Sequence, residues 1–105
     1  MARILSIGPD RIVLATRNRE LRLMGHDVRG VDTRANALAL AKFATFEFIL
    51  LCDQFLPAYA AELADELRIL APDSTILVLA GRPASLSTAE INTLLVNHRA
   101  GSRAA

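Results

Sequence analysis

The sequence predicts an α/β domain with an open parallel sheet and helices on both faces of that sheet. Short apolar runs alternate with longer amphipathic segments along the chain, which is typical of strand–helix units joined by right-handed crossovers. The run at 46–52 is nearly continuously apolar, as expected of a central parallel strand buried on both faces. Four such units fill the 105 residues, and no room remains for a fifth strand and helix.

The first unit has a strand, a turn and a capped helix. The apolar run at 3–7 ends at Gly8 and Pro9, a pair that favours a turn. Asp10 can cap the next helix, because its carboxylate accepts hydrogen bonds from N–H groups of the first turn. We expect this helix to end at Gly25, since glycine tolerates the positive φ that follows many helices.

The remaining elements follow from the same kinds of signal. Ser87 and Glu90 have the spacing of a capping box, in which each side chain accepts a backbone N–H of the first helical turn. We expect the helix that begins there to end near Asn97. The other expected elements are strands at 26–31 (an edge strand), 46–52 and 75–79 and helices at 35–44 and 58–70.

Composition indicates a single domain with an aliphatic core. The chain is 52% hydrophobic but only 5% aromatic, and it has no tryptophan. Burial of the aliphatic side chains can offset the entropy of ordering the chain, whereas a site built on stacked rings is disfavoured. We expect one domain at 1–99 and a flexible tail at 100–105, because the last residues are small and polar.

Charge and cysteine content restrict the class of protein. The formal net charge is only +1, so nucleic acid binding, which usually needs a strongly basic domain, is not expected. The single cysteine excludes an internal disulfide. No apolar run approaches the roughly 20 residues needed to cross a bilayer, and the first residues do not resemble a signal peptide. We therefore expect a cytoplasmic protein.

The charges are unevenly distributed along the chain. Residues 1–34 hold seven arginines against four acids, whereas residues 41–66 hold one lysine against five acids. The polar face of the first helix carries Arg11, Arg19 and Arg22. That face is a candidate surface for an acidic partner, although a solvated helix face is the simpler explanation.

From residue 3 to Gly81 the order of the segments resembles the receiver domain of two-component response regulators. The resemblance implies a flavodoxin-like fold, truncated to about four strands in the order 2-1-3-4. The segments that carry it are 3–7 (RILSI), 25–28 (GHDV), 35–41 (ANALALA), 46–57 (FEFILLCDQFLP) and 72–80 (PDSTILVLA).

The resemblance also implies a phosphorylation chemistry whose parts are largely missing here. Members of that family phosphorylate an aspartate after the third strand, with Mg²⁺ held by two acids after the first strand. A hydroxyl residue closes the fourth strand and a lysine closes the fifth. At the matching positions the acids are replaced by Gly8 and Pro9, with only Asp10 nearby, and the hydroxyl residue by Ala80. The only lysine, Lys42, falls in the second helix.

Two residues are candidates for the phosphoacceptor position. Counting from the 47–51 run places it at Cys52, and counting back from Pro57 places it at Asp53. We therefore expect a vestigial phosphorylation site made of Gly8, Pro9, Asp10, Cys52, Asp53 and Ala80. We expect no catalytic residue, no metal (Mg²⁺ included) and no cofactor.

These observations lead to the hypothesis of a stand-alone pseudo-receiver that acts through protein contacts and is not an enzyme. The missing fifth unit favours a homodimer that covers either the exposed edge of the fourth strand or the face of the sheet left uncovered. Three alternatives stay open. Asp53 can be a residual phosphoacceptor that uses Asp10 for the metal. The chain can be a small nucleotide-binding domain with Asp32 at a ribose, although the glycine-rich loop of such domains is missing. Cys52 can be a redox-sensing thiol.

Overall fold

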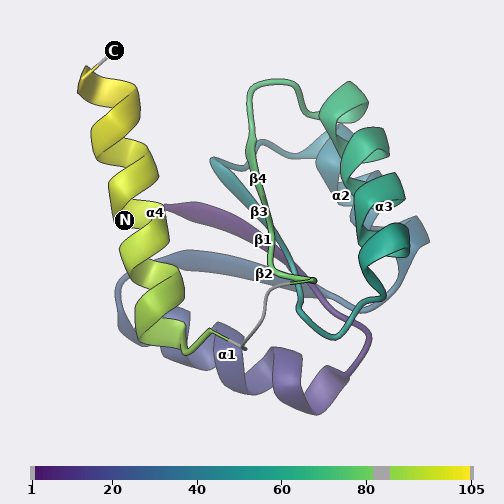
Figure 1. Ribbon diagram of the computed structural model, residues 1–105, viewed down its shortest axis with the longest axis horizontal. Helices are drawn as coiled ribbons and strands as arrows, with labels where there is room; N and C mark the ends of the chain where they lie inside the picture. The colour runs from purple at the N-terminus through teal and green to yellow at the C-terminus, as the bar shows by residue number, and fades with distance from the viewer. Residues whose placement is uncertain (1, 82–85, 105) are drawn as a thin grey trace.

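The computed structural model describes residues 2–81 and 86–104, with side chains as far as His98, and contains a four-stranded parallel sheet. The strand order is β2-β1-β3-β4 (Figure 1). The strands are β1 (Arg3–Ile7), β2 (Asp27–Val31), β3 (Phe48–Leu51) and β4 (Thr75–Val78). The helices are α1 (Arg11–Leu23), α2 (Arg34–Phe43), α3 (Pro57–Leu70) and α4 (Thr88–Ala104). The predicted fold class and strand order are confirmed.

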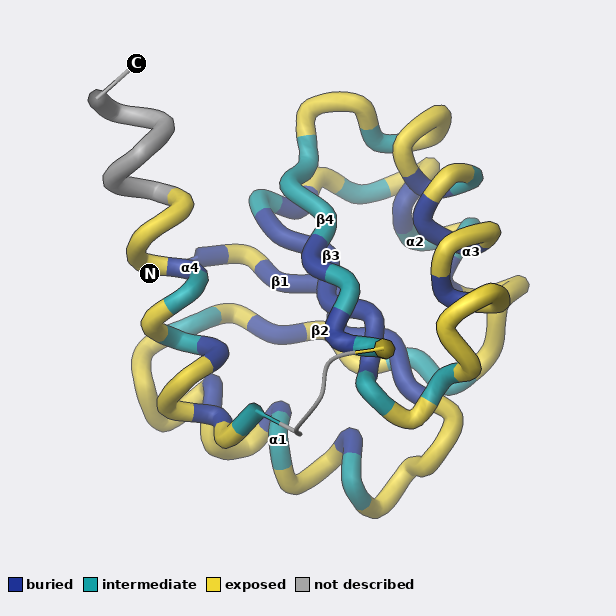
Figure 2. The backbone as a smooth tube through the Cα atoms, in the orientation of Figure 1, coloured by how far each residue is buried: buried dark blue, intermediate teal, exposed yellow. Residues whose placement is uncertain are grey.

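The sheet separates two hydrophobic clusters, one on each face. Helices α1 and α4 cover one face and helices α2 and α3 cover the other (Figure 1). Every residue of β3 is buried, which agrees with its continuously apolar sequence. The inner strands β1 and β3 form the buried centre of the molecule, whereas the outer strands β2 and β4 are more exposed (Figure 2). The first cluster includes Ile4, Leu21, Leu50, Leu77, Ile91 and Leu95, and the second includes Leu5, Ala37, Ile49, Leu63 and Leu67.

The helix ends follow the capping signals in the sequence. The Asp10 carboxylate caps α1, and the reciprocal bonds between Ser87 and Glu90 form the expected capping box. Gly25 has φ of 95°, a left-handed conformation that favours glycine after a helix. Helix α1 therefore ends at the predicted position.

The predicted end of the last helix near Asn97 is wrong. Helix α4 continues to Ala104, so most of the segment expected to be a flexible tail is helical, while Ala105 lies outside the described residues. Alanine and arginine dominate 99–104 and are good helix formers. The one glycine there, Gly101, costs only about 1 kcal/mol relative to alanine, and no proline interrupts the segment.

A histidine joins helix α4 to the turn before β2. The backbone N–H of Ala2 donates to His26 Nδ1 at 3.2 Å. Because Nδ1 accepts, the ring proton is on Nε2, which donates to Asn92 Oδ1 at 2.6 Å. His26 therefore has a packing role, and it is half-buried as expected for a histidine without metal partners.

Within the described residues, no helix is both long and apolar enough to cross a membrane.

Candidate functional site

The predicted vestigial site assembles at the edge of the sheet where the parallel strands end. Cys52 follows β3, and its N–H donates to the Ile7 carbonyl at 2.9 Å. Gly8 follows β1 and packs tightly against Cys52, since a Cβ built on Gly8 lies 3.2 Å from the Cys52 Cβ. Asp53 comes next in the chain, and Ala80 follows β4. The structure therefore places these residues near one another at one edge of the sheet.

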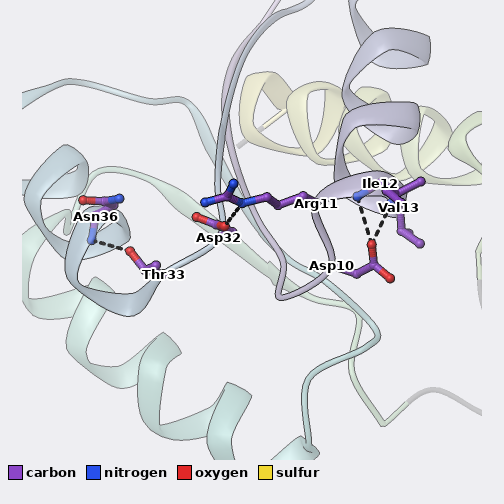
Figure 3. A network of polar contacts seen from close by, with 7 residues as sticks. All are labelled: Asp10, Arg11, Ile12, Val13, Asp32, Thr33 and Asn36. Carbon is purple, nitrogen blue, oxygen red and sulfur yellow. Dashed lines mark hydrogen bonds and ion pairs between the residues drawn. The ribbon is translucent and has the colours of Figure 1, made fainter.

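The segment after β1 provides few oxygen ligands for a cation. Gly8 and Pro9 have no side-chain oxygen. Asp10 points its carboxylate at the start of α1, where Oδ1 accepts from the N–H groups of Ile12 at 2.9 Å and Val13 at 3.3 Å (Figure 3). Asp10 is therefore a helix cap, and its carboxylate is engaged by the helix instead of the pocket.

An arginine that the sequence reasoning did not select lies in the pocket. Arg17 reaches from α1 to the end of β3, with its Nη2 3.7 Å from Asp53 Oδ1 and its Nη1 3.6 Å from Cys52 Sγ. The Arg17 and Asp53 side chains are only 12% and 16% exposed. A half-enclosed ion pair of this kind is screened much less by solvent than a surface pair.

The sequence does contain a signal that places Arg17 on the inner face of its helix. The inward face of α1 carries Leu14 and Leu21, and Arg17 lies three residues after the first and four before the second. Residues at those spacings share a face of a helix. Arg17 therefore points toward the sheet, unlike Arg19, which is exposed on the other side.

The Cys52 thiol is not set up as a reactive group. The side chain is buried, and burial raises the pKa of the thiol above its usual value. A backbone hydrogen bond at Gln54 and the charge of Arg17 lower the pKa, whereas the hydrogen bond from Sγ to Asp53 Oδ1, at 3.3 Å, raises it. Since the thiolate is the reactive form, these contacts favour the interpretation of Cys52 as a small buried apolar residue.

The residues of the pocket do not fit a magnesium ion. Mg²⁺ needs oxygen ligands in a near-octahedral arrangement. Positions 8 and 9 supply none, the Asp10 carboxylate caps a helix, and a guanidinium lies against Asp53. Across the described part of the chain, no group of three or more acidic, histidine or cysteine side chains could hold a metal ion.

The receiver resemblance implies a hydroxyl residue and a lysine, and neither Ala80 nor Lys42 supplies these groups to the pocket. Ala80 is half-buried and has no hydroxyl to offer a phosphoryl group. Lys42 is exposed on α2, where its ammonium group lies over the ring of Phe43, 5.5 Å from the ring centroid.

Two of the three arginines predicted as an interaction face bind groups of the chain itself. Arg11 forms an ion pair with Asp32 at the end of β2 (Figure 3), and the hydrogen bond from Arg11 lowers the pKa of the Asp32 carboxyl. Arg22 Nη2 donates to the Val28 carbonyl at 2.7 Å. Arg11 and Arg22 line a common groove beside β2, and Arg19 is not part of it.

The fold of this chain is similar to that of known proteins. No protein-family model matches the sequence, and no curated protein matches it. Solved structures do match the fold. The chemotaxis protein CheY4 of Vibrio cholerae superposes with a TM-score of 0.77 at 17% identity, over 92% of this chain and 98% of that one. The chain has the receiver fold.

Two further structures carry the same fold. A response regulator of Burkholderia pseudomallei, solved with a phosphorylated aspartic acid, a calcium ion and citrate, has a TM-score of 0.61 and 33% identity. The match covers 85% of this chain but only 52% of that one. A complex of the histidine kinase ThkA with the response regulator TrrA of Thermotoga maritima matches with a TM-score of 0.68 at 20% identity, over 85% of this chain and 78% of that one. The likeness establishes a receiver fold, here reduced to four strands.

Proposed function

We propose that this receiver-fold protein is a phosphorylation-independent interaction module of a signalling system, that it acts in the cytoplasm and that it is not an enzyme. The observation that carries the proposal is the Arg17 guanidinium at the carboxylate of Asp53. It supplies a permanent positive charge at the place where, by the family resemblance, a metal ion would assist phosphorylation.

The charge balance explains why Arg17 is a poor substitute for the metal. A phosphoryl group adds about −1.5 to −2 charges, and Mg²⁺ neutralises such charge while it also orients the oxygens. Arg17 has a single positive charge, and the negative charge of the Asp53 carboxylate already balances it. With Gly8 and Pro9 after β1, no acidic pair is present to hold a divalent ion.

A spectrum with a phosphoryl mimic tests this proposal. We expect the two-dimensional amide NMR spectrum to stay unchanged when Mg²⁺ and beryllofluoride are added, because no metal site forms beside Asp53. The same titration of the Asp53→Asn variant is the matched control. Shifts of Asp10, Asp53 and the residues before Pro57 that disappear in the control would overturn the proposal and identify a phosphorylated switch.

A protein partner is supported by the similar fold of TrrA, which is bound to the kinase ThkA in its solved complex. The partner we propose is a second copy of this chain, paired through β4. Strand β4 is an outer strand of the sheet. Thr75 donates its N–H to the Glu47 carbonyl just before β3, and Leu79 donates to the Leu51 carbonyl. The N–H and C=O groups of Ile76 and Val78 therefore point to the outer edge.

The two outer strands differ in a way that favours β4. Strand β2 carries Asp27 and Arg29, and Arg22 already occupies the outward carbonyl of Val28. Charges and side-chain caps of this kind protect an edge from pairing. Strand β4 has the sequence TILV, with no charge and no proline. Two copies related by a twofold axis can pair their β4 strands antiparallel and form one continuous sheet.

Sedimentation of a strand-edge variant tests the dimer. Ile76→Pro removes an N–H that points outward and leaves the bonds to β3 intact, and proline is tolerated at such edge positions. We expect the wild type to sediment as a dimer that dissociates on dilution, and Ile76→Pro to be a folded monomer. A wild type that stays monomeric at high concentration would contradict the proposal.

A further inference from the structure

Helix α4 has a partly apolar side that faces the open edge of β4. Asn92 marks the opposite side of the helix, because it binds His26 beside the start of β2, and β2 and β4 are the two outer strands. Ile91 and Leu95 point into the hydrophobic cluster beneath the helix. Because a helix has about 3.6 residues per turn, Leu94 is turned by about 160° from Asn92 and lies on the side of β4.

This side of α4 is hollowed. A groove of about 250 Å³ is lined by Leu86, Glu90, Thr93 and Leu94. Leu86 and Leu94 pack against the cluster beneath the helix but are only partly buried. In the monomer, the apolar surface of these two side chains therefore meets solvent at the place where a further helix could pack.

The spacing of helices over the sheet provides such a helix in the dimer. A helix is about 10 Å wide and adjacent strands lie about 4.8 Å apart, so one helix covers two strands. Helices α1 and α4 cover the four strands of this face (Figure 1). When β4 pairs with β4 of a second copy, the next helix on the continuous face, at the same spacing, is α4 of that copy.

We propose that the two α4 helices of the β4 dimer pack antiparallel against each other through Glu90, Leu94 and His98. This inference rests on the proposed dimer and adds a second element to its interface. The three residues are spaced by four positions, so they form one stripe along the helix. Leu77, in the middle of β4, packs in the same cluster as Leu94, so one twofold axis can pass at the level of both.

That axis makes the stripe complementary to itself. It sets Leu94 against Leu94 of the second copy. Glu90 and His98 lie four residues to either side of the axis, so Glu90 of each copy faces His98 of the other. Two such pairs, one on each side of the leucines, determine the direction and the register of the helices.

The chemistry of the two polar residues suits this pairing. Glu90 Oε1 accepts from the N–H of Ser87 at 3.1 Å, which lowers the pKa of the carboxyl. The group is therefore ionised at neutral pH, and its second oxygen can accept a further hydrogen bond. His98 is exposed, and an imidazole donates an N–H in both its neutral and its protonated form.

The edge of β4 is too short to form a stable interface by itself. Stable interfaces between proteins bury about 1,200–2,000 Å², whereas the four residues of β4 span only about 13 Å. The helix pair adds the apolar contact that the strand edge lacks. A second copy is the occupant that this side of α4 fits, because it brings the complementary stripe beside the same strand edge.

Sedimentation of α4 variants tests the proposal. Leu94→Glu places a charge in the apolar centre of the helix pair and should weaken dimerisation about tenfold or more. His98→Glu sets like charges opposite each other and should weaken it by a similar factor, whereas His98→Lys keeps a donor for Glu90 and should keep the dimer. The matched control is Val96→Glu. Val96 is 54% exposed and is turned by about 160° from Leu94, so dimerisation should not change.

A second background tests the pairing of Glu90 with His98. Glu90→Gln keeps the capping box, in which glutamine can replace glutamate, and removes the charge. His98→Glu should then weaken the dimer clearly less than it does in the wild type. His98 is exposed, so this variant decides the question even where Leu94→Glu lowers the stability of the fold.

The outcomes separate this inference from the proposed function. A dimer that is lost in Ile76→Pro but unchanged in Leu94→Glu and His98→Glu would overturn the helix pair and leave the β4 dimer intact. A wild type that stays monomeric would contradict the β4 dimer and the helix pair with it. Equal weakening by His98→Glu and Val96→Glu would indicate general charge repulsion and would overturn the pairing. The titration with the phosphoryl mimic is independent of all three outcomes.

Discussion

Replacing Arg17 with methionine is expected to destabilise the domain by about 2 kcal/mol. The change leaves the Asp53 carboxylate in a mostly enclosed site without the guanidinium 3.7 Å away. Methionine keeps much of the length of the arginine stem, so the loss reflects charge more than volume. Chemical denaturation measures the change, and the melting temperature should fall by about 10 °C in a domain of this size.

A double-mutant cycle isolates the ion pair. Asp53→Asn removes the carboxylate charge, and in that background Arg17→Met should cost clearly less than in the wild type. Arg19→Met, at an exposed position of the same helix, is the matched control and should change stability by no more than about 0.5 kcal/mol. Additive costs of the two pocket variants would show that Arg17 does not stabilise Asp53.

Replacing Gly30 with alanine is expected to cost about 2 kcal/mol, within the range for overpacked sites. The added Cβ would lie 2.2 Å from Asn18 Nδ2. The amide must then shift from its buried position. Alanine is otherwise better than glycine in a strand, so a loss of stability would be due to the collision. Urea denaturation measures it.

The partner variant Asn18→Ala tests the cause of that loss. Truncating Asn18 removes the atom that collides, so Gly30→Ala should cost little or even stabilise the domain in the Asn18→Ala background. Gly25→Ala is a useful comparison, because no atom lies within 4 Å of a Cβ there and any cost comes from the φ of 95° alone. An equal cost of Gly30→Ala with and without the Asn18 side chain would contradict the collision.

Much of the fold could be predicted because its signals are local. The apolar run of β3, the Asp10 cap, Gly25 and the Ser87–Glu90 box each act within a few residues, and all are found in the structure. The error at the end of α4 is also local in origin. Small residues after Asn97 favour a frayed tail and a helix almost equally, and the helix prevails to Ala104.

The candidate site was predicted only in part. The positions of Gly8, Cys52, Asp53 and Ala80 at the ends of their strands follow from the order of the elements, because parallel strands end at one edge of the sheet. Arg17 was missed, although its spacing from Leu14 and Leu21 placed it on the inner face of α1. A charged residue on an inner face is easily assigned to solvent when its partner is unknown.

The amino-acid sequence was sufficient to establish the α/β class, the number of strand–helix units and the absence of acidic side chains at positions 8 and 9, since these depend on residue type and short spacing. Tertiary structure alone decided which distant residues meet. The approach of Arg17 to Asp53 spans 36 positions and that of Asn18 to Gly30 spans 12. Both contacts depend on how α1 packs across the sheet, and that packing is set by the whole apolar face of the helix and the strands beneath it.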